Sequence, residues 1–208
     1  MYTVINHPLI QDKLSNLRDP ATKDRDFRKI LYEVSLLMSF EVYKDLQLEK
    51  GDEIVTYTNA PFTKLKLNQN VILAPILRAG IGFLDGFLEV LPNAQIGTVG
   101  LFRDEKTLQT NEYCFKIPAN KDSVVIVLDP MLATGNSAIY TINKLKALGY
   151  KNIKFVALIG CPEGVKAFEE HFPDVQLYLC NIDERLNEVG YILPGLGDAG
   201  DRLFGTHE

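Results

Sequence analysis

Short apolar segments alternate with amphipathic segments along most of the chain. The apolar segments predict strands buried on both faces of a sheet: Val71–Ala74, Val124–Leu128, Ile153–Ile159 and Gln176–Cys180. The segments between them place apolar residues at helical spacing: Asp26–Val42, Ile81–Leu91, Ala138–Leu148 and Glu163–His171. Strands that alternate with helices predict an α/β fold with a doubly wound, mainly parallel sheet flanked by helices.

Two further regions predict small antiparallel elements. Residues Ile54–Thr58 alternate between apolar and polar, which indicates a strand of a small, partly exposed sheet. Ile96–Phe102 and Glu112–Ile117 also read as strands, and the polar run Asp104–Asn111 joins them. This pattern predicts a β-hairpin flap that stands off the body.

The ends of the chain differ from the rest. Residues 1–24 carry two prolines and mixed charge, which predicts an N-terminal arm. Residues 190–206 combine five glycines with large apolar residues, and a disordered tail seldom carries so many of the latter. We therefore expect an ordered, glycine-rich hood that brings backbone close to a ligand. No linker divides the chain, so residues 1–208 are predicted to form a single domain.

The segment Val124–Ser137 carries the strongest chemical signal. A buried strand ends at Asp129, and a short turn containing Thr134 and Gly135 then opens a helix. Unpaired N–H groups and the helix dipole make such a turn an anion site, and an acidic residue at the strand end can accept hydrogen bonds from a ribose. The alternative is an ordinary turn with a threonine cap. This segment contains neither G-x-G-x-x-G nor G-x-x-x-x-G-K-[ST], which disfavours a dinucleotide or nucleoside-triphosphate loop here.

Three loops follow buried strands and should meet at the carboxyl edge of the sheet. They contain Arg78, Asp129–Ser137 and Cys161–Gly164. Arg78 stands beside Gly80, so a guanidinium fork is combined with a backbone that can bend tightly. That combination suits a diphosphate, whereas the alternative is a surface arginine on a loop. We expect all three loops to line one crevice.

Composition narrows the class of protein. The 208 residues carry a net charge of −5, which gives no overall attraction to nucleic acid or to an anionic membrane. The three cysteines form no C-x-x-C pair, and the three histidines lie far apart, so neither a disulfide framework nor a metal cage built from protein ligands is expected. The start of the chain lacks the pattern of a signal peptide, and no apolar run is long enough for a bilayer. These features predict a cytoplasmic protein.

Several motifs together resemble those of the uracil phosphoribosyltransferases, a branch of the type I phosphoribosyltransferases. They are H-P-L at 7–9, P-I-L-R-A-G at 75–80, F-R-D-E-K-T at 102–107, D-P-M-L-A-T-G at 129–135, P-E-G at 162–164 and G-Y-I-L-P-G-L-G-D-A-G-D-R-L-F-G-T at 190–206. The resemblance implies the fold of that family, with the flap and a C-terminal hood that binds the base. It also implies transfer of a phosphoribosyl group from 5-phosphoribosyl 1-diphosphate (PRPP) to uracil, giving UMP and diphosphate in pyrimidine salvage.

The resemblance assigns roles to particular residues. Catalytic roles fall to Arg78 and Asp198. PRPP would be bound by both of these residues and by Arg103, Asp129, Pro130, Met131, Leu132, Ala133, Thr134, Gly135, Asn136 and Ser137. Uracil would be bound by Ile192, Gly197, Asp198 and Ala199. The turn after Leu77 would contain a non-proline cis peptide, as in many relatives.

The resemblance also implies ligands and partners, and at two positions this sequence differs from the usual residue of the family. Mg²⁺ would bind mainly through PRPP and water. GTP is an effector of some bacterial relatives, and a homodimer or larger homo-oligomer is expected. Asn136 stands where the family usually has a glycine, and asparagine tolerates the left-handed region better than most residues. Lys106 stands where an acidic residue is more usual. The alternatives are a nucleotide-sensing regulator that binds RNA, and a purine or orotate phosphoribosyltransferase.

Overall fold

The computed structural model describes residues 1–103 and 110–206, and its centre is an eight-stranded sheet. The strand order is β1–β12–β10–β8–β4–β6–β7, with β5 paired to β4 beside this path. The bounds are Tyr2–Val4 (β1), Val71–Leu77 (β4), Gln95–Ile96 (β5), Thr98–Arg103 (β6), Thr110–Lys116 (β7), Val124–Leu128 (β8), Asn152–Val156 (β10) and Gln176–Leu179 (β12). All neighbours are parallel except β6 and β7, which confirms the predicted mainly parallel sheet.

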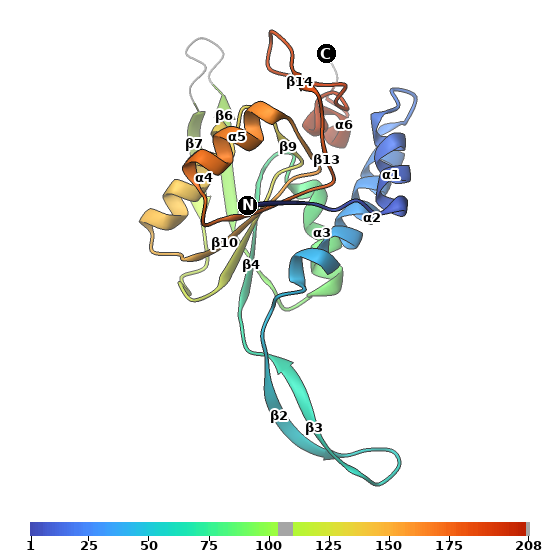
Figure 1. The fold of residues 1–208 in the computed structure, drawn as a ribbon, viewed down its shortest axis with the longest axis vertical. Helices are drawn as coiled ribbons and strands as arrows, with labels where there is room; N and C mark the ends of the chain where they lie inside the picture. Colours follow the sequence, from blue (N-terminus) through green and yellow to red (C-terminus); the bar gives the residue numbers. More distant parts are fainter. Residues whose placement is uncertain (104–109, 207–208) are drawn as a thin grey trace.

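Helices cover both faces of this sheet (Figure 1). One face carries α1 (Pro8–Arg18), α2 (Asp24–Tyr43) and α3 (Ile81–Val90), together with the short C-terminal helix α6 (Ala199–Phe204). The other face carries α4 (Asn136–Ala147) and α5 (Pro162–His171). None of the described helices is both long and apolar enough to cross a membrane.

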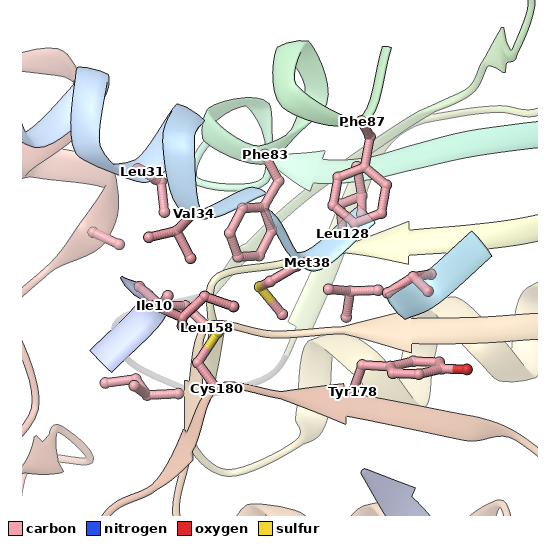
Figure 2. Packing of buried hydrophobic residues seen from close by; sticks show 14 of the residues in the cluster. Ile10, Leu31, Val34, Met38, Phe83, Phe87, Leu128, Leu158, Tyr178 and Cys180 are labelled. Atoms are coloured by element: carbon pink, nitrogen blue, oxygen red, sulfur yellow. The ribbon is translucent and has the colours of Figure 1, made fainter. Parts of the chain in front are cut away.

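Strand β8 shows why the apolar runs form the centre of the sheet. It is paired on both sides, with β4 and with β10. Successive side chains point to opposite faces, so Ile126 and Leu128 pack towards α1–α3 while Val125 and Val127 pack towards α4 and α5. Figure 2 shows Leu128 in the first of these cores, beside Met38 of α2 and Phe87 of α3. Every residue of the strand must therefore be apolar, as the sequence pattern predicts.

The N-terminal segment differs from the expected arm. Residues 2–4 form β1, which pairs in parallel with β12 at the edge of the sheet. Helix α1 buries Ile10, Leu14 and Leu17 against the core. Apolar residues at positions 10, 14 and 17 follow helical spacing, but mixed charge between them hides the pattern. The first 18 residues are thus part of the folded body.

The small exposed sheet is a two-stranded hairpin. β2 (Leu48–Val55) and β3 (Pro61–Leu67) pair antiparallel and extend far from the body (Figure 1). The sequence pattern identified only the end of β2. Both strands expose most of their side chains, including the apolar residues Leu48, Phe62 and Leu65.

Short strands extend the structure beyond the carboxyl ends of the main sheet. β9 (Met131–Leu132), β11 (Ile159–Gly160) and β13 (Asn181–Ile182) form a three-stranded parallel sheet with β11 in the middle. β14 (Arg185–Leu186) pairs antiparallel with β15 (Ile192–Leu193). These strands connect the segment after Asp129 with the segment that leads into the C-terminal tail.

Candidate active site

Asp129 lies half-buried at the end of β8, where the sequence predicts the site. Its backbone amide donates to the Val156 carbonyl over 3.1 Å, which continues the pairing with β10. Its carboxylate accepts a hydrogen bond from the Met131 amide over 3.3 Å. Burial raises the pKa of the Asp129 carboxyl to about 7; the Met131 hydrogen bond opposes this shift and the charge of Asp198 adds to it. A carboxyl with this pKa gains or loses its proton near neutral pH. It only accepts hydrogen bonds when ionised, and it can also donate one when protonated.

Asp129→Asn is expected to stabilise the unliganded protein at alkaline pH. Because the folded pKa lies above the ordinary value of 3.8, the folded chain binds the proton more tightly than the unfolded chain. Stability is therefore lost as the pH rises from about 4 to about 7 in the wild type but not in the variant. Thermal unfolding should show the variant about 2 °C or more higher at about pH 8, with no difference near pH 4. If the variant and the wild type unfold at the same temperature at both pH values, the raised pKa of Asp129 is contradicted.

The turn between β9 and α4 has the geometry of an anion site. Gly135 caps α4 with φ of +83°, and the Thr134 hydroxyl accepts a hydrogen bond from the Asn136 amide over 3.5 Å. The dipole of α4 adds partial positive charge at this end. Asn136 is already the first residue of the helix, and among the described non-glycine residues only Asn59 has a positive φ. The expectation that Asn136 must tolerate the left-handed region is therefore wrong, because Gly135 takes that conformation.

Arg78 directly follows the neighbouring strand β4, and its side chain extends towards the C-terminal tail. Its guanidinium donates to Asp201 over 3.0 Å and to the Thr206 hydroxyl over 3.2 Å, and it lies 5.6 Å from the centre of the Phe204 ring. The side chain is still 53% exposed. Arg78 thus connects the loop after β4 to α6 while keeping much of its surface accessible.

Two adjoining cavities lie at this edge of the sheet. One has a volume of about 200 Å³, and its lining includes Arg78, Ala79, Asp129, Thr134, Asn136 and Ser137. The other has a volume of about 340 Å³, and its lining includes Asp129, Met131, Ile192, Gly197, Asp198 and Ala199. Ala79 and Asp129 line both. The first cavity offers an arginine, hydroxyls and a helix N-terminus, whereas the second is formed largely by the tail.

A model of the family "Uracil phosphoribosyltransferase" matches residues 4–206. The chain belongs to the uracil phosphoribosyltransferase family. A uracil phosphoribosyltransferase from Streptococcus suis is 51% identical over 206 residues, covering 99% of this chain and 98% of the relative. Another from Ligilactobacillus salivarius is 52% identical over the same length and coverage. These relatives confirm the resemblance that the motifs carry.

Solved structures confirm the fold of this family member. The AQ2163 protein from Aquifex aeolicus superposes with a TM-score of 0.92 at 40% identity, covering 98% of both chains. A hypoxanthine phosphoribosyltransferase from Staphylococcus aureus superposes with a TM-score of 0.55 at 12% identity over 83% of this chain. The second similarity concerns the fold alone, and it confirms the predicted phosphoribosyltransferase architecture.

Most of the residues predicted for the phosphoribosyltransferase site lie around the two cavities. Met131 and Ala133 line the cavity formed by the tail, whereas Pro130, Leu132 and Gly135 are buried and line neither. The peptide bond between Leu77 and Arg78 is cis, as the resemblance implies. The predicted roles of all these residues in binding remain predictions.

Three predictions have a different outcome. Arg103 ends β6, but its side chain and the flap residues 104–109, including Lys106, lie outside the described part of the structure. Cys161–Gly164 was expected to line the crevice, yet it lines neither cavity. The Cys161 thiol instead contacts the Ala133 carbonyl at 3.2 Å. This segment therefore supports the loop after Asp129 from behind.

Sequence reasoning missed the groups that hold the tail in place. Arg18, Asp183 and Arg202 make hydrogen bonds with tail residues. Arg18 and Asp183 are 165 positions apart, and no local pattern pairs residues at such a separation. The local signal for Asp183 is that an acidic residue follows shortly after the apolar strand pattern Gln176–Cys180.

Proposed function

We propose that this protein transfers the phosphoribosyl group of PRPP to uracil, giving UMP and diphosphate. The observation that carries the proposal is the pair of adjoining cavities that share Asp129. One offers groups that bind phosphate and the other offers the backbone of a flat, glycine-rich segment. Incubation with PRPP, Mg²⁺ and uracil should release diphosphate in an amount equal to the UMP formed, and only when uracil is present. Release without uracil, or no UMP, would contradict the proposal.

The reaction needs positioning more than covalent chemistry. The N-terminus of α4 and the hydroxyls of Thr134 and Ser137 bind the 5′-phosphate, and Asp129 accepts hydrogen bonds from the ribose hydroxyls. The anomeric carbon then lies at the boundary between the two cavities. N1 of uracil attacks it from the tail side and loses its proton to solvent, while the C1′–O bond breaks and diphosphate leaves on the other side, near Arg78. Arg78 and Arg103 stabilise the charge that develops on the leaving group.

Arg78→Lys is expected to lower turnover about tenfold or more, since one charge-assisted hydrogen bond to an ionised group is worth about 1.5–3 kcal/mol. Lysine keeps the charge but loses the planar fork that can hold a diphosphate with two parallel bonds. Initial rates at saturating substrates measure the effect. Arg25→Lys is the matched control, because Arg25 is exposed and pairs only with its neighbour Asp26 among the described residues. Wild-type rates in Arg78→Lys would remove Arg78 from the mechanism.

The carboxylates beside the cavities suit a Mg²⁺ ion that is bound mainly by PRPP. Among the described residues, no cluster of three or more acidic, histidine or cysteine side chains forms a metal cage. Asp129 and Asp198 nevertheless lie close enough for the charge of Asp198 to raise the pKa of Asp129. When bound, Mg²⁺ neutralises the diphosphate charge, and both carboxylates can hold its water ligands. Activity should be lost in EDTA and restored by excess Mg²⁺, whereas full activity in EDTA would contradict this part of the proposal.

The protein acts as a homodimer or a larger homo-oligomer in the cytoplasm. The support for self-association is the projecting β2–β3 hairpin, whose exposed apolar residues include Leu48, Val55, Tyr57, Phe62 and Leu65. Light scattering on the eluting protein should give a mass above the 23.4 kDa of one chain. A monomer at micromolar concentration would contradict it. The three cysteines are free, as is usual in a reducing compartment.

We also propose that GTP is an effector of this enzyme, because the sequence resembles a family in which some bacterial members respond to GTP. The same initial-rate assay with and without GTP tests it, and unchanged kinetics across the titration would remove GTP from the proposal. An RNA-binding regulator on this scaffold would instead show measurable affinity for RNA and little turnover. The net charge of −5 weighs against that alternative.

A further inference from the structure

A buried carboxylate outside both cavities is saturated with hydrogen bonds. The Asp183 side chain is 0% exposed and faces Arg18 at the end of α1 in a two-pronged ion pair, with both distances 2.6 Å. The Asn181 amide donates to one of its oxygens over 2.6 Å and the Gly195 amide donates to the other over 2.9 Å. Burial raises the pKa of Asp183, but the hydrogen bonds from Arg18 and Asn181 outweigh it and hold the pKa below its ordinary value. Asp183 is therefore ionised at neutral pH.

The same ion pair holds both polar groups of Gly195. Its N–H donates to Asp183, and its carbonyl accepts a hydrogen bond from Arg18 over 2.7 Å. Gly195 has φ of +64°, and a Cβ at this position would lie 2.0 Å from the Ile192 carbonyl oxygen. The turn at 192–195 is thus tight. The Arg18–Asp183 ion pair holds both the amide and the carbonyl of Gly195, its last residue.

A second arginine holds the next carbonyl. Arg202 of α6 donates to the Leu196 carbonyl over 2.8 Å and to the Asp19 carbonyl, which follows α1, over 2.9 Å. In a trans peptide the N–H points away from the C=O, so the N–H groups of Leu196 and Gly197 point away from these two arginines. Gly197 lines the larger cavity, and no described residue accepts a hydrogen bond from its amide.

The ion pair is also linked to the loop that follows Asp129. The Asp183 amide donates to the Gly160 carbonyl over 2.8 Å, at the end of β11. β11 pairs with β9, so Gly160 lies opposite Leu132. Backbone hydrogen bonds therefore connect the phosphate side of the site to Asp183, and the Asp183 carboxylate continues the connection to the Gly195 amide. Movement at Asp183 would shift the tail relative to the loop.

We propose that Arg18 and Asp183 are positioning residues for base recognition. They hold the carbonyl of Gly195 away from the cavity, and together with Arg202 they orient the Gly197 amide to donate to a carbonyl oxygen of the base. Ile192 and Gly197–Ala199, the residues assigned to the base, lie on either side of this fixed point. The inference rests on the proposed function, because it assumes that the base occupies the larger cavity.

Arg18→Lys tests the inference, with Arg25→Lys as the matched control on the neighbouring helix. Lysine keeps the charge but cannot reach both Asp183 and the Gly195 carbonyl with one fork. The KM for uracil should rise about tenfold, the factor that losing one charge-assisted hydrogen bond implies. The kcat and the KM for PRPP should stay within about twofold of wild type, because the backbone hydrogen bond from Asp183 to Gly160, which supports the phosphate side, does not involve the Arg18 side chain. Asp183→Asn should behave similarly, since an amide cannot accept all four hydrogen bonds.

Hydrogen exchange supplies a readout that does not depend on turnover. Arg18→Lys should speed exchange in peptides covering 192–198 and leave peptides covering 130–137 unchanged, whereas Arg25→Lys should change neither. An unchanged KM for uracil in an active Arg18→Lys enzyme, or an equal rise in both KM values, would overturn the inference alone. A wild-type enzyme that makes no UMP would overturn the proposed function, and with it the inference.

Discussion

Gly80→Ala is expected to lower kcat/KM about a hundredfold or more, because a displacement of about 1 Å at a reacting centre can cost that much. A Cβ on Gly80 would lie 2.2 Å from the Leu128 carbonyl oxygen and 2.6 Å from the Ile76 amide nitrogen. Both are backbone atoms at the carboxyl ends of β8 and β4, so neither can rotate away. The turn must shift, and it carries Arg78 on one side of the site while Leu128 leads directly into Asp129.

Gly51→Ala in the β2–β3 hairpin is the matched control for this substitution. A Cβ there meets its nearest atoms at 3.6 Å, which is ordinary van der Waals contact. Thermal unfolding of both variants separates a displaced turn from a protein that no longer folds. A folded Gly80→Ala protein with wild-type kinetics would show that the packing of this turn does not position the site.

Cytosine is expected to react at least about 10⁴-fold less efficiently than uracil, since a site built on hydrogen bonds rejects an analogue that leaves its buried polar groups unpaired. The edge of uracil presents an N–H between two carbonyl oxygens. Cytosine replaces one of these oxygens with an amine, so a backbone N–H such as that of Gly197 would face another donor. The side chains of the tail offer few alternatives, because apart from Asp198 the segment 192–199 is apolar or glycine.

A panel of uracil, cytosine, hypoxanthine, adenine and orotate at saturating PRPP and Mg²⁺ measures this selectivity. Hypoxanthine and adenine test size, because tail residues form much of the wall of the larger cavity. Orotate tests charge, because its carboxylate would lie near Asp198. Comparable turnover of cytosine or of a purine would show that the tail does not select the base through its backbone.

The centre of the fold could be predicted because its signal is local. Strands β4 and β8 are apolar at every position, which happens only where both faces of a sheet are covered, and α2 carries an uninterrupted stripe from Phe27 to Val42. The docking of α1 could not be predicted in the same way. Its three buried residues are interspersed with charged ones, and the contacts that hold it come from the distant Asp183 and Arg202.

In the site, too, the parts formed by residues adjacent in sequence could be predicted, and the parts held by distant residues could not. Asp129 and the turn at Thr134 follow from a strand, a glycine and a helix that are adjacent in sequence. Helix α6 was not predicted, because six residues are too few for a periodic pattern, and its cap depends on Asp198 accepting from the Asp201 amide over 2.9 Å. Sequence thus indicated that the tail is ordered, while its conformation depends on tertiary hydrogen bonds.

In the proposed complex, the phosphate lies at the N-terminus of α4 and the base lies against the tail. A crystal structure of the complex with UMP tests this most directly. We expect the phosphate within hydrogen-bonding distance of the amides at 134–137, the ribose hydroxyls at Asp129, and the two carbonyl oxygens and the N–H of the base paired with backbone groups of 192–199. UMP bound in the opposite orientation, or a base recognised only by side chains, would contradict this placement of the phosphate and the base.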